Sequence, residues 1–118
     1  MNKSIIYVKC ENFSVLIIEI YKLLIDKKEF VMSKQLLKSS TSIGANVAES
    51  RFAQSKKDFI SKMHIALKET AETEYWIKLL YKSEYIDEKS SVSLLTDCLE
   101  IKRILIASIN TAKSKNHT

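Results

Sequence analysis

The chain contains no proline and only one glycine, Gly44, among its 118 residues. Strands joined by tight turns need residues that accept or pre-set special backbone angles, chiefly glycine and proline. Helices and short helical connections need far fewer, so the sequence argues against a β-rich fold and predicts an all-α protein. Its length is that of one domain, which we place over residues 1–118 and which can bury a continuous core without disulfides or metal.

Apolar residues recur every three or four positions in four segments, which is the spacing that lines one face of a helix. These segments predict helices at about residues 11–26, 34–53, 56–83 and 88–114. We expect Ser33, Ser55 and Asp87 to cap the last three helices, with Ser55 and Asp58 forming a capping box. Connections of only a few residues place neighbouring helices antiparallel. The pattern therefore predicts an antiparallel up-down-up-down four-helix bundle.

Gly44 falls inside the second predicted helix, among the small residues Ser40, Ala45 and Ala48. Glycine in a helix costs about 1 kcal/mol relative to alanine. We therefore expect a neighbouring helix to approach closely at this position.

The first predicted helix carries more apolar surface than one core requires. Val15, Ile18 and Ile25 lie away from its main apolar stripe. A helix that is apolar on more than one face usually has a second partner. We therefore expect part of this helix to face another subunit, which makes the protein a homo-oligomer.

The sequence predicts a cytoplasmic protein without a membrane segment. The apolar stretch at residues 5–8 is too short for a signal-peptide core. The most apolar run, residues 15–25, is interrupted by Glu19 and Lys22 and falls short of the roughly 18 apolar residues that span a bilayer. Cys10 and Cys98 form no CxxC pattern, so we expect two free thiols in a reducing compartment.

No residues stand out as catalytic, metal-ligating or cofactor-binding. A di-metal bundle needs a Glu-x-x-His pair on each of two helices, and neither His64 nor His117 has an acid at that spacing. The single glycine leaves no glycine-rich phosphate loop. The acids Glu69, Glu72 and Glu74 have lysines within helical reach, which favours an ion-paired face. We expect a non-enzymatic protein with no cofactor and no metal.

Basic residues are the feature most suggestive of a partner. The chain has 19 basic and 14 acidic residues, a net charge of +5, and the excess lies in residues 32–57 and 101–118. Lysines and arginines neutralise phosphates, so RNA or DNA is a candidate partner. An ordinary solvated surface is the alternative. The candidate nucleic-acid contacts are Lys34, Lys38, Arg51, Lys56, Lys57 and Lys62.

Four aromatic residues follow in and after the third predicted helix: Tyr75, Trp76, Tyr81 and Tyr85. Such rings stack on bases in single-strand binders. Helical spacing points them in different directions, and Tyr81 falls on the apolar stripe. We expect them to be buried or in a subunit contact.

An ordered string of motifs carries a family resemblance. It comprises Gln35-Leu36, Lys38-Ser39-Ser40, Ser42-Ile43-Gly44-Ala45-Asn46-Val47-Ala48-Glu49, Ser55-Lys56-Lys57-Asp58-Phe59-Ile60, Ile65-Ala66-Leu67-Lys68-Glu69, Glu72-Thr73-Glu74-Tyr75-Trp76 and Tyr85-Ile86. Over roughly residues 11–112 the chain resembles the four-helix-bundle proteins encoded in 23S ribosomal RNA intervening sequences. Related proteins are the accessory variability determinants of diversity-generating retroelements.

This resemblance implies a barrel-shaped homopentamer that binds RNA or DNA through a basic surface. It also leaves open a second hypothesis, a structural adaptor for a reverse transcriptase or another protein. Two departures bear on the choice. Ser50 stands where many relatives have glycine, and Leu37 and Lys38 stand where many have two arginines. The lost arginines weaken the case for phosphate contacts, since lysine lacks their planar bidentate fork.

Overall fold

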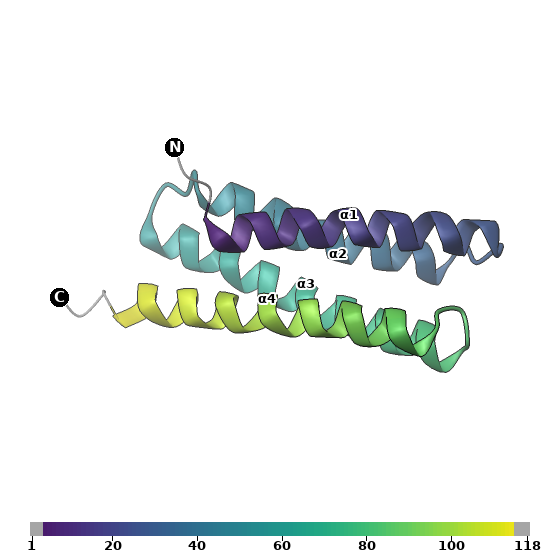
Figure 1. Cartoon of the computed structure of the whole chain (residues 1–118). Coiled ribbons are helices and arrows are strands. Elements are labelled where there is room, and N and C mark those ends of the chain that lie inside the picture. Colours follow the sequence, from purple (N-terminus) through teal and green to yellow (C-terminus); the bar gives the residue numbers. More distant parts are fainter. Residues whose placement is uncertain (1–3, 115–118) are drawn as a thin grey trace.

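The computed structural model describes residues 4–114, and four helices account for most of them (Figure 1). They are α1 (Ile5–Asp26), α2 (Met32–Ser50), α3 (Lys56–Lys82) and α4 (Glu88–Ser114). Each helix packs against its neighbour in sequence, and α1 also contacts α4. The bundle measures 52 × 24 × 20 Å. The predicted fold class, an all-α four-helix bundle, is confirmed.

Helix α1 begins at Ile5, six residues before the predicted start at residue 11. The Ser4 hydroxyl caps it by accepting a hydrogen bond from the Tyr7 amide at 3.2 Å. Ile6 and Cys10 in the added turns are buried in the core. The prediction was wrong because residues 5–8 form an unbroken apolar run, which shows no helical alternation of apolar and polar side chains.

The Glu29 carboxylate, rather than the predicted Ser33 hydroxyl, caps α2. Its two oxygens accept hydrogen bonds from the amides of Ser33 at 2.8 Å, Met32 at 3.0 Å and Val31 at 3.2 Å. Ser33 is buried, and its hydroxyl donates to the Glu29 carbonyl at 2.7 Å. The helix therefore starts at Met32, two residues before the predicted position, and ends at Ser50, three residues before the predicted residue 53.

The other two predicted caps are confirmed. The Ser55 hydroxyl accepts a hydrogen bond from the Asp58 amide at 3.0 Å, and the Asp87 carboxylate accepts one from the Ser90 amide at 2.8 Å. The return arm of the capping box differs from the prediction, since the Asp58 carboxylate accepts from the Gln54 amide at 3.2 Å. These caps fix the starts of α3 and α4 within a residue of the predicted positions.

Helix α2 comes close to α1 at Gly44. A Cβ atom added to Gly44 would lie 3.3 Å from the Cys10 Cβ and 3.9 Å from the Ser14 hydroxyl. This is tighter than ordinary van der Waals contact, so the expected close approach is confirmed. On the opposite side of α2, the Ser39 and Thr73 hydroxyls form a buried hydrogen bond of 2.9 Å to α3.

The buried core is continuous and takes residues from all four helices: Ile6, Cys10, Phe13, Ile17, Leu24, Leu36, Ile43, Val47, Met63, Ala66, Ile77, Leu80, Ile86, Leu94, Cys98, Ile101, Leu105 and Ile109. Val15 and Ile18 lie outside it and are exposed, as the excess apolar surface of α1 predicts. Six large hydrophobic residues that the pattern placed on apolar stripes are exposed instead: Leu16, Leu23, Tyr81, Val92, Leu99 and Ile106. Apolar spacing alone cannot tell a core face from an exposed apolar face, which explains the error.

We predict that Glu29→Ala lowers the free energy of unfolding by at least about 2 kcal/mol, because three amides at the start of α2 lose their acceptor and one of them is buried. Urea unfolding followed by circular dichroism measures the change. Glu19→Ala on the exposed side of α1 is the matched control and should stay within about 0.5 kcal/mol of the parent. Equal stability of the two variants would contradict the capping role.

We predict that Gly44→Leu destabilises the bundle by about 1–3 kcal/mol, because the side chain would push α1 away at Cys10. Ala45→Leu, one residue along on an exposed position, should change stability much less. Thermal melts of both variants test this, and an unchanged melting temperature for Gly44→Leu would show that the helices can separate there without cost.

Candidate nucleic-acid interface

Four of the six predicted contact residues lie together at one end of the bundle. Since α2 and α3 run antiparallel, the end of α2 and the start of α3 meet there, with Arg51, Lys56, Lys57 and Lys62 around the connection. Lys34 and Lys38 lie near the start of α2. Thirteen residues of helix, about 20 Å, separate Lys38 from Arg51. The six residues therefore do not form one patch.

Lys38 lies close to an acidic group of α3. Partial burial raises the pKa of Glu69, as does the nearby Glu72 carboxylate, while the charges of Lys38 and Lys68 oppose that shift. Part of the positive charge of Lys38 is thus offset by a carboxylate of the same chain. This neighbourhood is less suited to phosphate than its lysine content suggests.

Two of the four clustered residues are engaged within the protein. The guanidinium of Arg51 lies over the Tyr7 ring, 5.3 Å from its centroid, which is a cation–π arrangement. The Lys62 ammonium forms an ion pair with the Glu49 carboxylate at 3.3 Å. An exposed pair of this kind is worth little to stability, and Lys62 can exchange its partner at small cost.

Lys56 and Lys57 are exposed in the first turn of α3, and within residues 4–114 neither pairs with an acid. The helix dipole adds positive potential at this N-terminus. The nearest acid along the chain, Asp58, has its carboxylate held by the Gln54 amide. These two lysines are the strongest phosphate candidates of the predicted set.

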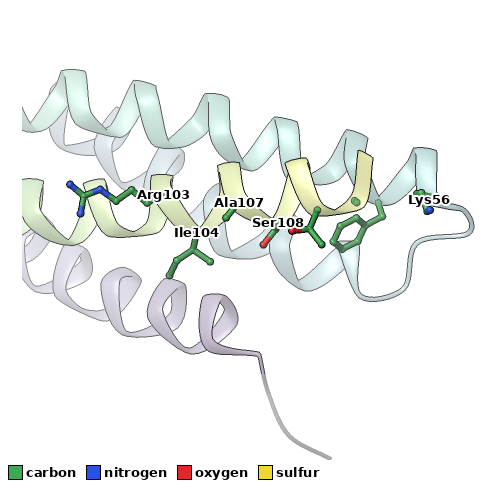
Figure 2. A pocket seen from close by; sticks show the side chains of 8 residues that line it. Lys56, Arg103, Ile104, Ala107 and Ser108 are labelled. Atoms are coloured by element: carbon green, nitrogen blue, oxygen red, sulfur yellow. The ribbon is translucent and has the colours of Figure 1, made fainter. Parts of the chain in front are cut away.

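Helix α4 adds two cations that the predicted site did not include, Arg103 and Lys113. Lys56 and Arg103 line the same groove, an open hollow of about 710 Å³ between α3 and α4 (Figure 2). We call the six cations Arg51, Lys56, Lys57, Lys62, Arg103 and Lys113 the basic end. The excess of basic residues in 101–118 was visible in the sequence. Only the antiparallel packing of α3 on α4 shows that Arg103 of this stretch lines the same groove as Lys56. Lys115 and His117 fall outside the described residues.

The four aromatic residues Tyr75, Trp76, Tyr81 and Tyr85 do not gather into one base-stacking platform. Trp76 is half-buried, donates through Nε1 to the Glu72 carboxylate at 3.0 Å, and meets Tyr75 edge-on with ring centroids 5.1 Å apart. Tyr85 is half-buried, whereas Tyr75 and Tyr81 are exposed. The predicted burial therefore holds only in part, for Trp76 and Tyr85. Tyr81 was expected in the core and is exposed instead.

The two cysteines are structural. Both are free and buried, and burial raises the pKa of each thiol to about 12, so both stay protonated near neutral pH. A protonated, buried thiol is neither a nucleophile nor a metal ligand. No group of three His, Cys, Asp or Glu side chains is placed to hold a metal ion in the part of the chain that the structure describes.

None of the four helices, over the residues described, combines the length and hydropathy required to cross a membrane. The longest, α3 and α4, each have 27 residues but carry charged side chains throughout.

The comparison with curated proteins gave no match. Among solved structures, the chain is similar to a protein of unknown function from the S23 ribosomal protein family of Bacteroides thetaiotaomicron. The two share 50% sequence identity and superpose with a TM-score of 0.88, over 89% of this chain and 98% of the other. The sequence model of the 23S rRNA-intervening sequence proteins matches residues 2–107. The chain therefore belongs to the family of 23S rRNA-intervening sequence proteins.

Proposed function

We propose that the protein is a non-enzymatic, cytoplasmic homo-oligomer that binds RNA or DNA through its basic end. The observation that carries this proposal is the meeting of two basic stretches from distant parts of the sequence. Lys56 and Lys57 of α3 lie at the same end of the bundle as Lys113 of α4, Arg103 lines the same groove as Lys56, and no acid lines that groove. Clustered cations without acidic partners suit a polyanion.

The expected contacts are electrostatic and carry little sequence information. Lysines neutralise phosphates as point charges, and binding to phosphates alone does not distinguish bases. Each phosphate contact releases condensed counterions, so affinity should fall steeply as salt rises. The name of the family refers to ribosomal RNA, which makes structured RNA the first substrate to test.

The homo-oligomer is supported by apolar surface that the single chain leaves uncovered. On α4, Val92, Leu99 and Ile106 recur every seven residues and are exposed. Six exposed apolar residues lie on α1: Ile5, Val8, Val15, Leu16, Ile18 and Leu23. Such an extent of exposed apolar residues on two neighbouring helices favours a protein contact. The family resemblance makes a pentamer the expected assembly.

A protein adaptor is the second candidate function. The connections between helices expose large apolar side chains, namely Phe30, Val31 and Phe52, the last of them 85% exposed. Exposed apolar side chains that lie together mark protein–protein contacts more often than scattered ones do. A reverse transcriptase of a diversity-generating retroelement is the partner that the resemblance suggests, and a reverse transcriptase gene beside this one would favour this candidate.

We predict that light scattering at micromolar concentration gives about five times the 13.6 kDa chain mass, because the exposed apolar residues of α1 and α4 need a partner. Leu99→Lys should lower the mass, since it puts a charge in the apolar row of α4. Ala71→Lys, an exposed position on α3, is the control and should leave the mass unchanged. A parent mass of one chain would rule out the oligomer.

We predict that Lys56→Glu combined with Lys57→Glu weakens binding to structured RNA and duplex DNA alike and flattens the dependence of affinity on salt. On duplex DNA the slope should lose about 0.9 for each phosphate contact removed. The fold should persist, because acids in a first helical turn interact favourably with the helix dipole. Fluorescence anisotropy titrations at several salt concentrations measure both effects.

Lys34→Glu combined with Lys38→Glu is the matched control for that experiment. It reverses two lysines of α2 that lie about 20 Å and about 25 Å from Arg51 along the helix. This control should bind nearly as tightly as the parent. If both double variants bind like the parent, the lysines of the basic end are ordinary solvated side chains.

A further inference from the structure

The groove between α3 and α4 differs from the rest of the basic end because its floor is apolar. Phe59 of α3 and Ile104, Ala107 and Ala112 of α4 line it, and Ser108 and Thr111 add hydroxyls. In Figure 2 the labelled side chains of Ile104, Ala107 and Ser108 lie between Arg103 and Lys56, which mark its two ends. Binding to phosphates alone requires cations and hydrogen-bond donors, and it does not require apolar side chains.

The groove is open enough to take a ligand of moderate size. Its volume of about 710 Å³ falls in the range of small-molecule pockets, and from Arg103 to Ala112 it follows nine residues of α4, about 14 Å. Ala107 is exposed and Phe59 half-buried, so part of the aromatic side chain remains accessible. None of the residues that line the groove is acidic.

We propose that this groove receives unpaired nucleobases of a single-stranded segment, a statement that rests on the nucleic-acid binding proposed above. Bases lie against Phe59 and the apolar wall of α4, and the flanking phosphates reach Lys56 and Arg103. Single-strand binders combine these same two elements, an aromatic surface for the bases and cations along the backbone. The positive charge continues past the groove to Lys57 and Lys113, as a strand with a charge on every nucleotide requires.

The shape of the groove favours unpaired bases over paired ones. In a duplex the bases are stacked and paired, and turning one outward costs a few kcal/mol. A slot between two helices can therefore accept bases from a loop or single strand at little cost, while the duplex presents only its phosphates. The protein should prefer single strands and loops to duplex at equal charge.

The test compares three fluorescent DNA ligands by anisotropy at about 50 mM salt: an unstructured 12-nucleotide strand, the same strand with its central residues abasic, and the matching duplex. The abasic strand keeps its phosphates and loses only bases. We expect it to bind about tenfold more weakly than the intact strand, the effect of losing one or two stacked bases. Equal binding of the intact and abasic strands overturns the base groove and leaves the phosphate contacts standing.

Two groove variants locate the effect, each with a matched control. Phe59→Leu keeps apolar bulk and removes the aromatic face, and Phe30→Leu makes the same change on an exposed position at the other end of the bundle. Ala107→Leu fills the groove from an exposed helical position, and Ala71→Leu repeats the change on α3 outside the groove. Both groove variants should shrink the tenfold preference for the intact strand and leave the salt slope unchanged.

Either control variant losing the preference as fully as its groove partner overturns the assignment. Ala107→Leu decides the case if Phe59→Leu unfolds, because Ala107 does not belong to the core. If the parent binds none of the three ligands, and no structured RNA, both the base groove and the proposed function fall, and a protein helix becomes the candidate occupant of the groove.

Discussion

The capped turn between α1 and α2 is the constraint on which the rest of the bundle depends. With one glycine in the chain, the left-handed position after α1 is taken by Lys28, with φ of 64°. The Glu29 amide then donates to the Leu24 carbonyl at 2.9 Å. The Glu29 residue is only 6% exposed, and its carboxylate accepts hydrogen bonds from three amides at the start of α2. Burying a carboxylate is costly unless it is hydrogen-bonded. The hydrogen bonds to Glu29 therefore hold the turn in this conformation.

That turn sets the register of α2, and small residues along α2 then let it approach both neighbours. Gly44 meets α1 at Cys10, and the Ser39 hydroxyl reaches Thr73 of α3. Buried hydroxyls are satisfied within the bundle, and none of the buried side-chain polar atoms among residues 4–114 lacks a partner. Helix α2 packs against both α1 and α3, while α1 and α4 each keep apolar side chains exposed. The same asymmetry thus leaves exposed the apolar surface that the proposed oligomer would cover.

The proposed nucleic-acid surface follows from the antiparallel topology. An up-down-up-down bundle brings the end of α2, the start of α3 and the end of α4 to one place, whatever their separation in sequence (Figure 1). Charges in those three segments therefore add, whereas Lys34 and Lys38 at the start of α2 stay apart, and Lys38 lies close to Glu69. Net charge is a property of the whole chain, but a binding surface depends on which cations share one end.

The sequence by itself determined the helix count, the fold class and the caps at Ser55 and Asp87, because apolar period and capping oxygens act within a few residues. It also identified Gly44 as a point of close approach. The Glu29 cap also acts locally, on amides two to four residues away, although the sequence pattern pointed to Ser33 instead. Only the tertiary structure decided that Val92 and Leu99 face outward and that Arg103 lines the same groove as Lys56. Those outcomes depend on which faces of different helices meet, and contacts between residues far apart in the chain leave no periodic trace in the sequence.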